Sequence, residues 1–486
     1  MSVTPPATPP AATQLPLRLK LFHGLGSIAY GVKDNGFSTF LLIFYNQVIG
    51  LDAGLVGTAI MLALIADAFA DPVIGELSDR TRTRWGRRLP WLFAAPLPLA
   101  MAWWALWHPP AGGIAAVVWL IGFGIVVRTL VSMCEVPSVA LVPELTADYD
   151  ERTILMRYRF LFGWAGGLAL LMVAYGVFFN GPRGVADPDG YGAYALSGSV
   201  TMALAVLLSA WGQRRWVMAL PPLAPPPAHG LRQILSEMRH SLSNRAFLWL
   251  IGAALFALVN QGITFSLNNY LLTYFWRLEG YELLGFAVML FVSVGLAFVL
   301  VAPLSARLGK SRAAMVAGAI SLTITTSIFA SWLLRLFPGA PDEPEIVPLF
   351  LATIAANSFA ITMMMLISSM MADVVEASQS ETGRRSEGLF FAGYFFMQKC
   401  ATGIGIFLAG LMLTFAAFPV DAVAGQVPLT VLDRLALLYM VTIAVLGIIG
   451  IAVLGRFPIT REDHAARVAA LDAAARTDPD AAGAHP

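Results

Sequence analysis

The sequence predicts an all-α integral membrane protein with twelve transmembrane helices, six in each half of the chain. The first observation is composition: 58% of the 486 residues are hydrophobic and 13% are charged, against about 25% charged in soluble proteins. The second is a series of about twelve apolar runs of membrane-spanning length. The third is that basic residues concentrate in alternate connections between these runs. A soluble chain of this length would need polar surfaces that the composition cannot supply.

Each apolar run is long enough to cross a bilayer core, which requires about 20 residues in a helix. Runs that exceed this length are expected to tilt or to extend beyond the membrane. In chain order, the predicted spans are 22–49, 53–78, 89–108, 113–143, 153–179, 190–212, 246–275, 281–306, 313–337, 347–376, 386–416 and 430–455.

The widest polar gap, residues 213–245, divides the chain into two halves of six spans. It contains "PPLAPPPAHG" followed by "LRQILSEMRHSL", which predicts a cytoplasmic linker with an amphipathic helix at the membrane interface. The halves are residues 22–212 and 246–456. Residues 1–21 are expected to be a disordered cytoplasmic segment, and residues 457–486 a cytoplasmic tail. We see no clear sequence repeat between the halves, so internal symmetry is inferred from the span count alone.

The basic residues predict that both termini are cytoplasmic, because Lys and Arg are enriched in cytoplasmic loops. The segment "DRTRTRWGRRLPW" between spans two and three holds five arginines. The connections on the other side carry isolated basic residues, namely Arg183, Arg277, Arg335 and Arg434. A bacterial inner membrane is the expected location. The net charge of +1 gives no sign of nucleic-acid binding, and we find no phosphate-binding loop of an ATP-driven pump.

Ionisable residues within the predicted spans are the candidate functional residues, because each costs several kcal/mol unless it is paired or hydrated. Asp67 and Asp71 lie one helical turn apart and share a face. Arg128 and Glu135 are seven residues apart and also share one. The acids are Asp34, Asp67, Asp71 and Glu135, and the bases are Arg128, Arg159, Lys399 and Lys33. This near balance predicts a cluster around a water-filled cavity, although any one pair could simply hold two helices together, and Arg128 could serve to neutralise Glu135.

Three segments resemble the glycoside–pentoside–hexuronide:cation symporters, a branch of the major facilitator superfamily that includes the melibiose permease. They are "DAFADPVIGELSDRTRTRWGRRLPW", "EVPSVALVPELT" and "ADVVEASQSETGRRSEGLFFAGYFFMQK". The resemblance extends from about residue 22 to 455. It implies two six-helix bundles with a central site that works by alternating access. Transporters of this kind commonly bind substrate near the bilayer midplane.

The resemblance also implies roles for individual residues. It assigns Asp67 and Asp71 to the cation site, with Ser132 and Lys399 beside them, and Asp34, Glu135 and Arg159 to the sugar site, where Arg128 and Lys399 are further candidates. Carboxylates accept hydrogen bonds from sugar hydroxyls and arginine donates them. Near the cytoplasmic surface, the predicted conformational or gating residues are Asp79, Arg84, Arg87, Asp373 and Glu376.

The chain departs from the melibiose permease at several of these positions. Ala70 stands in place of an asparagine, Ser132 in place of a threonine, and Val139 in place of a tryptophan that stacks on the galactoside. Glu135 replaces an aspartate, and Arg128 stands where that permease has glycine. An added cation in the cavity predicts a substrate with a carboxylate, such as a uronide.

The sequence therefore predicts a secondary transporter, not an enzyme, that couples uptake of a glycoside or uronide to a cation. Because Ala70 removes one oxygen ligand, the proton is the predicted coupling ion, with sodium at Asp67 and Asp71 as the alternative. No cofactor or nucleic acid is expected; the partners are a small molecule and the lipid bilayer, and the expected state is a monomer. The alternatives are a carrier of a lysolipid-like amphiphile or sucrose-type sugar, a passive channel, and, remotely, an intramembrane aspartyl enzyme.

Overall fold

The computed structural model describes residues 15–110, 112–146, 148–181, 183–220, 245–339, 343–382 and 387–458. Throughout these ranges, every regular element is a helix. Ten of the helices are individually long and apolar enough to cross a membrane. The other two predicted spans, 22–49 and 89–108, are occupied by consecutive shorter helices. The all-α membrane fold is thus confirmed, whereas the count of twelve spans remains a prediction.

The N-terminal half begins with several short helices over the first predicted span and continues through the helices of the other predicted spans. Their bounds are α1 (Leu17–Leu25), α2 (Ile28–Asn35), η1 (Gly36–Phe40), α3 (Leu41–Ile43), η2 (Phe44–Val48), α4 (Ala53–Arg80), α5 (Leu89–Ala94), α6 (Pro96–Leu106), α7 (Gly113–Ala140), α8 (Val142–Leu145), α9 (Tyr149–Val173), η3 (Ala174–Phe178), η4 (Gly184–Ala186) and α10 (Pro188–Met218). Helix α1 starts before residue 22, so the expectation of disorder up to residue 21 is wrong for residues 17–21.

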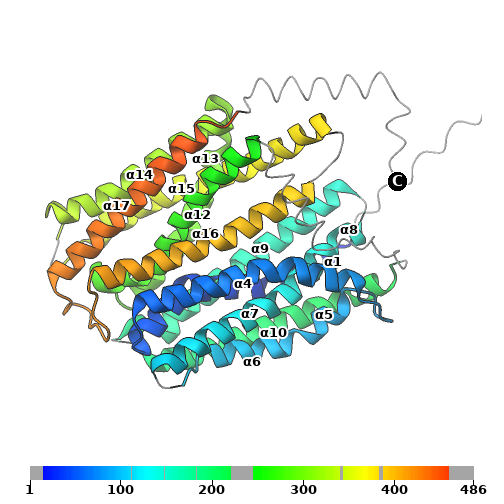
Figure 1. The fold of residues 1–486 in the computed structure, drawn as a ribbon, viewed down its shortest axis with the longest axis horizontal. Helices are drawn as coiled ribbons and strands as arrows, with labels where there is room; N and C mark the ends of the chain where they lie inside the picture. Colours follow the sequence, from blue (N-terminus) through cyan, green and yellow to red (C-terminus); the bar gives the residue numbers. More distant parts are fainter. Residues whose placement is uncertain are drawn as a thin grey trace, which may run out of the picture.

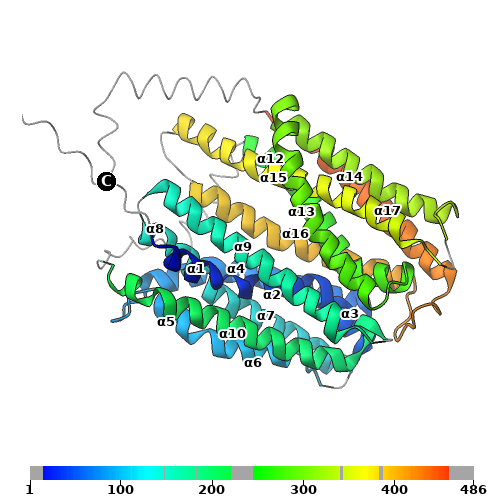
Figure 2. The same ribbon diagram turned by 180° about the vertical axis from the view of Figure 1, so that it is seen from behind.

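The C-terminal half consists of six long helices. They are α12 (Arg245–Tyr270), continued by η5 (Leu271–Phe275), α13 (Tyr281–Leu308), α14 (Lys310–Leu333), α15 (Ile346–Thr382), α16 (Glu387–Phe415) and α17 (Leu429–Leu454). The predicted amphipathic helix falls mainly on residues 221–244, which lie outside the described residues. Figures 1 and 2 show the two halves side by side, with α16 of the second half against α4 of the first.

Small residues let α4 and α16 approach closely, as is common between membrane helices. A Cβ atom added at Gly410 would lie 2.3 Å from the carbonyl oxygen of Ala53, and one at Gly57 would lie 3.0 Å from that of Ile406. Further along, Phe69 and Phe396 pack edge to face. This helix pair therefore forms a continuous contact between the halves, and it passes the candidate site.

Hydrogen bonds join the halves at one end of the molecule, which we call the joined end (residues 38–54 against 266–274 and 410–422). Tyr270 donates to the side chain of Asn46 at 2.8 Å, and Asn269 donates to the carbonyl of Thr39 at 2.8 Å. Tyr175 in turn donates to Asn269 at 2.7 Å. All five residues named here are buried. The joined end is therefore packed and closed to solvent.

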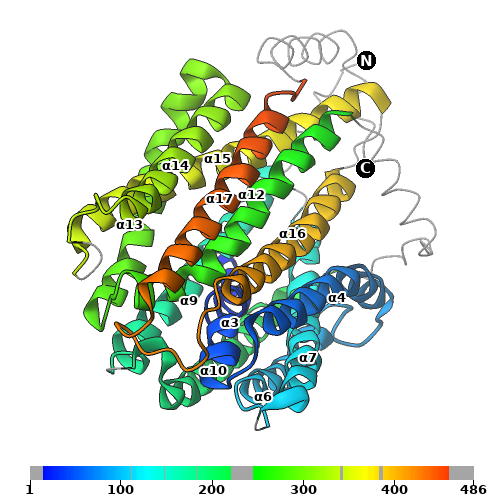
Figure 3. The same ribbon diagram turned by 60° about the vertical axis from the view of Figure 1, so that its left-hand side comes forward.

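At the opposite end, which carries residues 81–88 and which we call the loop end, ion pairs form inside each half. Lys20 pairs with Glu151 in the N-terminal half, and Lys310 pairs with Asp373 in the C-terminal half. Figure 3 shows the two groups of helices from a third direction, with α4 and α16 adjacent and α14 and α15 far from α6 and α7.

A sequence repeat that we did not expect links the first span of each half. Residues 41–50, "LLIFYNQVIG", and residues 271–280, "LLTYFWRLEG", share two leucines, a pair of aromatic residues and a final glycine. Each segment contains a π-helical turn, a feature found at functional sites. Each ends on a glycine with positive φ, +83° at Gly50 and +48° at Gly280, a conformation that favours glycine. The internal symmetry is therefore visible in sequence after all.

Candidate cation and substrate site

The predicted pair of aspartates lies at the centre of a charged cluster between the halves. Helix α4 places Asp67 and Asp71 one turn apart, facing α7 and α16. Arg128 of α7 places Nε and Nη2 each 2.9 Å from Asp67 Oδ2. Ser132, one turn further along α7, donates to one carboxylate or the other, with its Oγ 3.0 Å from Asp67 Oδ1 and 2.6 Å from Asp71 Oδ1. Four predicted residues thus come together in the first half alone.

Lys399 of α16 extends this cluster across the interface between the halves. Its Nζ lies 2.6 Å from Asp71 Oδ2 and 2.9 Å from Asp67 Oδ2. Lys399 belongs to the C-terminal half and both acids belong to the N-terminal half, so this double ion pair connects the two halves directly. A charge-assisted bond of this kind is stronger than a neutral hydrogen bond. The predicted lysine near the two aspartates is therefore in contact with both.

Two further ion pairs lie in the N-terminal half. Arg159 of α9 donates to Glu135 at 2.5 Å and also to the hydroxyl of Ser138. Lys33 lies 3.5 Å from Asp34 on the same helix and 4.1 Å from the ring centre of Tyr30. All four acids and all four bases identified within the spans are consequently paired.

The expected neutralisation of Glu135 by Arg128 does not occur. Arg128 instead reaches α4, where it pairs with Asp67, and Glu135 pairs with Arg159 of α9. Their spacing places Arg128 and Glu135 on one face of α7, but each of these long side chains pairs with a residue of a neighbouring helix. The predicted contact of Arg128 with an anionic substrate is not supported either, because this side chain is 3% exposed and lies against Asp67.

Exposure separates the acids from the bases of the site. The side chains of Asp34, Asp71 and Glu135 are 54%, 31% and 28% exposed, whereas those of Lys33, Arg128 and Arg159 are each 3% exposed. Asp67 is buried together with the bases. The most exposed groups of the cluster are thus carboxylates; three of the four cations are buried, and Lys399 is 15% exposed.

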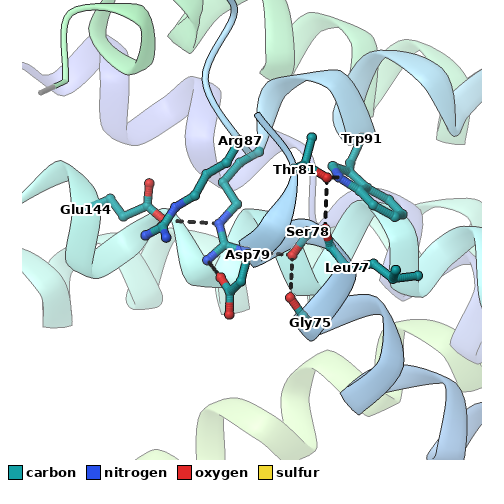
Figure 4. A network of polar contacts seen from close by, with 9 residues as sticks. Gly75, Leu77, Ser78, Asp79, Thr81, Arg87, Trp91 and Glu144 are labelled. Carbon is teal, nitrogen blue, oxygen red and sulfur yellow. Dashed lines mark hydrogen bonds and ion pairs between the residues drawn. The ribbon is translucent and has the colours of Figure 1, made fainter. Parts of the chain in front are cut away.

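The predicted gating residues near the basic loop also form a network, drawn in Figure 4. Arg87 pairs with Glu144 of α8 at 2.8 Å. Arg88 contacts three partners: Asp79, Ser78 and the same carboxylate of Glu144. Both Arg88 and Glu144 were missed as site residues. The signal was available, since Glu144 is an acid next to the end of span four, close to a strongly basic loop.

The remaining predicted gating residues do not join that network. Arg84 lies over the ring of Trp85, with its Cζ 5.8 Å from the ring centre. Asp373 accepts two bonds from Lys310 within the C-terminal half. The side chain of Glu376 lies outside the described residues. Asp373 is thus paired within its own half, whereas the basic loop pairs with Asp79 and Glu144.

Two helical halves, closed at one end and linked through a buried charge cluster at their interface, define a secondary transporter of the major facilitator type. The comparisons agree with this class. The sequence matches the family described as MFS/sugar transport protein over residues 22–461. The chain belongs to this family, which confirms the family resemblance, and its relatives are transporters, not enzymes.

Individual relatives and structures are similar along almost the entire chain. A putative glycoside/cation symporter of Escherichia coli, YagG, is 25% identical and the match covers 89% of this chain and 90% of that protein. An isoprimeverose transporter of Lactiplantibacillus pentosus is 26% identical, with 85% and 84% covered. The crystal structure of a D-xylose-proton symporter superposes with a TM-score of 0.62 at 15% identity, covering 91% of this chain and 98% of the other. The last comparison supports the fold.

Proposed function

We propose that this protein is a cation-coupled symporter that takes up a glycoside by alternating access across a bacterial inner membrane. The observation that carries the proposal is the position of Lys399, which reaches from one half of the molecule to both aspartates of the other. A change of charge on these aspartates alters the attraction between the halves. Cation binding is in this way connected to the movement that exposes the site on alternate sides. The family and the glycoside/cation symporter among its relatives support the proposal.

The coupling ion in this proposal is the proton, and Asp71 is its acceptor. Asp71 is the accessible member of the pair, whereas Asp67 is buried between Arg128, Lys399 and Ser132. A proton on Asp71 removes its ionic attraction to Lys399, which weakens the contact between the halves near the site.

The proposed substrate is a neutral, polyhydroxylated sugar. The accessible charged groups Asp34 and Glu135 are acceptors for sugar hydroxyls, and Arg159 lies behind Glu135 and fixes its position. An anionic uronide would meet mainly carboxylates at this surface, because Arg128 and Arg159 are buried and the partly exposed Lys399 is already paired with Asp67 and Asp71. The isoprimeverose transporter among the relatives fits a glycoside substrate.

The loop end is the proposed cytoplasmic end, in agreement with its excess of arginine. Since the joined end is closed, water reaches Asp34 and Asp71 from the loop end. The conformation described here is therefore assigned as inward-facing. The outward-facing conformation requires the bonds of Asn269 and Tyr270 at the joined end to open.

Uptake into proteoliposomes under separately imposed proton and sodium gradients tests the proposal. The expected result is sugar accumulation driven by the proton gradient, with no response to sodium at matched pH. Asp71→Asn should abolish accumulation and retain exchange of labelled sugar at equilibrium. Asp187→Asn, at an N-cap on the first half, is the matched control and should transport normally.

The same vesicles separate the alternatives. Counterflow of labelled sugar identifies a carrier and excludes a channel, and chemically unchanged sugar after uptake excludes an intramembrane enzyme. A glucuronide accumulated in preference to its neutral glycoside would overturn the substrate assignment. Accumulation of a lysolipid, with no sugar accumulated, would replace the sugar by an amphiphile, a substrate that the accessible apolar side chain of Val139 would suit.

A further inference from the structure

We propose that Arg128 is a built-in cation that excludes sodium from the two-aspartate site of this transporter. This inference rests on the proposed symport, because it specifies which ion the site can accept. Arg128 was expected either to neutralise Glu135 or to contact an anionic substrate, and neither role fits its position in the structure. Both functions fail for one reason: the guanidinium is buried against Asp67.

The oxygen geometry of the site is that of an incomplete site for a hard cation. Oδ1 of Asp67 and Oδ1 of Asp71 both lie within hydrogen-bond distance of Ser132 Oγ, at 3.0 and 2.6 Å. These three oxygens converge on one side of the aspartate pair. Carboxylate and hydroxyl oxygens are the ligands that hard cations prefer. The oxygen donors of a sodium site are therefore partly present.

The opposite side of the aspartate pair is occupied by nitrogen cations. Oδ2 of Asp67 receives two guanidinium nitrogens of Arg128 and the ammonium of Lys399, all at 2.9 Å. Oδ2 of Asp71 receives the same ammonium at 2.6 Å. Two positive charges thus balance the two negative charges with no further ion. A sodium ion would leave both carboxylates and both cations charged and would add a fifth charge beside the two cations, which low-dielectric surroundings penalise strongly. A proton differs, because it bonds to a carboxylate oxygen of Asp71 and neutralises that carboxylate.

The charges around Asp67 and Asp71 do not offset the excess positive charge that a bound sodium ion would create. The next acids outward are Asp34 and Glu135, and each is already paired, with Lys33 and Arg159 respectively. Phe37 covers the other side of the Arg128 guanidinium, with its ring centre 5.0 Å from Cζ. The guanidinium of Arg128 is therefore contacted by Asp67 and by the ring of Phe37. Its removal, in contrast, leaves a net negative pair with three converging oxygens.

The test is sodium binding by the purified full-length protein, measured with radiolabelled sodium and by thermal unfolding in sodium chloride against choline chloride of equal ionic strength. Wild type should show no saturable sodium binding and no sodium-dependent shift in unfolding temperature. Arg128→Gly should gain both saturable sodium binding and a sodium-dependent rise in unfolding temperature. Arg128→Gln, which leaves less empty volume, should gain them if the glycine variant does not fold. Arg128→Lys keeps the charge and should stay insensitive to sodium.

Two controls locate the effect. Adding Asp67→Asn to the Arg128→Gly background should abolish the gained sodium response. Arg159→Gln removes another buried, paired arginine from the same half and should gain no response. Saturable sodium binding by wild type overturns the inference on its own. It is equally overturned if the folded Arg128 variants lacking charge remain insensitive, or if Arg159→Gln gains the same response.

This experiment is independent of sugar transport. If the Arg128 variant gains sodium binding but vesicles accumulate no sugar under any gradient, the proposed function fails and the inference stands. If vesicles accumulate sugar on a proton gradient while wild type binds sodium, the inference fails and the symport stands.

Discussion

At the scale of single residues, the site is a set of buried cations behind accessible carboxylates. Burying a charge is costly unless it is paired, and each buried base here has a partner on its own or a neighbouring helix. Arg128 with Asp67 and Arg159 with Glu135 are the two pairs that join α7 to α4 and to α9. Loss of one member leaves the other charge buried and unpaired, and loss of both members removes that cost.

This pairing predicts a specific pattern of rescue. Arg159→Gln should lower the free energy of unfolding by about 3 to 5 kcal/mol, and adding Glu135→Gln should recover much of the loss. Arg128→Gln should be recovered by Asp67→Asn but not by Glu135→Gln. Thermal unfolding of the purified single and double variants measures this. Recovery of Arg128→Gln by Glu135→Gln would contradict the pairing.

At the scale of elements, the basic loop after α4 is fastened to α8. Glu144 accepts from Arg87 and from Arg88, and Arg88 also binds Asp79 at the end of α4. The loop thus ties together the ends of three spans of one half. All of these contacts lie inside the N-terminal half, so they set the shape of that half at the loop end.

Arg87→Ala should therefore slow transport and leave the equilibrium affinity for substrate within a few-fold of wild type. The reason is that the loop lies far along α4 from the central cluster, yet helps to hold the helix ends in register during the conformational change. Initial uptake rates and binding titrations measure the two quantities. Arg84→Ala is the control, because Arg84 contacts only its neighbour Trp85 in the described network and should leave the rate unchanged. Equal rates for both variants would contradict the assignment.

The packing of α4 on α16 makes a second prediction at this scale. Gly410→Ala places a methyl group 2.3 Å from the carbonyl oxygen of Ala53, so the helices must separate. Overpacking of this kind costs about 1 to 3 kcal/mol, and the unfolding temperature should fall. Gly295→Ala, at a helical position with no atom within 4 Å of the added group, should leave it unchanged. Similar behaviour of the two variants would show that the close approach is unimportant.

The sequence predicted the positions of the helices better than it predicted which charged side chains pair with each other. Apolar length determined the spans, because the bilayer demands it of any spanning helix. The residues that the family resemblance assigned to a cation site, Asp67, Asp71, Ser132 and Lys399, do lie together, because α4, α7 and α16 bring their side chains into contact. The partner of Arg128 was not predictable from spacing, because the rotation of α7 against α4 decides which acid the side chain reaches. Glu144 was missed because it lies just outside the predicted spans, to which the search for paired charges was confined, although its place beside the end of span four was a usable signal.

At the scale of the whole molecule, the joined end holds the two halves in one relative orientation. Asn269 both donates to Thr39 and accepts from Tyr175, so one side chain of the second half bonds to two spans of the first. These bonds are neutral, and each contributes about 0.5 to 1.5 kcal/mol. They are strong enough to favour one conformation and weak enough to open in a transport cycle.

Asn269→Ala should therefore shift the population toward the conformation that is closed at the loop end. The expected change in the free-energy difference between the two conformations is about 1 to 3 kcal/mol, from the loss of two bonds. Distances between spin labels placed at the loop end of each half measure the populations. Asn260→Ala on the same helix, which loses only a bond to Ile443 within the second half, is the matched control. An unchanged distance distribution for Asn269→Ala would contradict this role of the joined end.

The balance of four acids and four bases in the described membrane interior has an electrical consequence. With its aspartates and their partners ionised, the unloaded interior carries no net charge, so the membrane voltage neither drives nor opposes its return. In the proposed symport, one added proton and a neutral sugar make the loaded form carry one positive charge. That charge gains about 2.3 kcal/mol for each 100 mV of potential, enough for roughly a fiftyfold sugar concentration ratio. In such a transporter the membrane voltage acts only on the step in which the loaded protein changes conformation. The current carried by that step should reverse sign with the membrane potential. The return of the unloaded protein should carry no current.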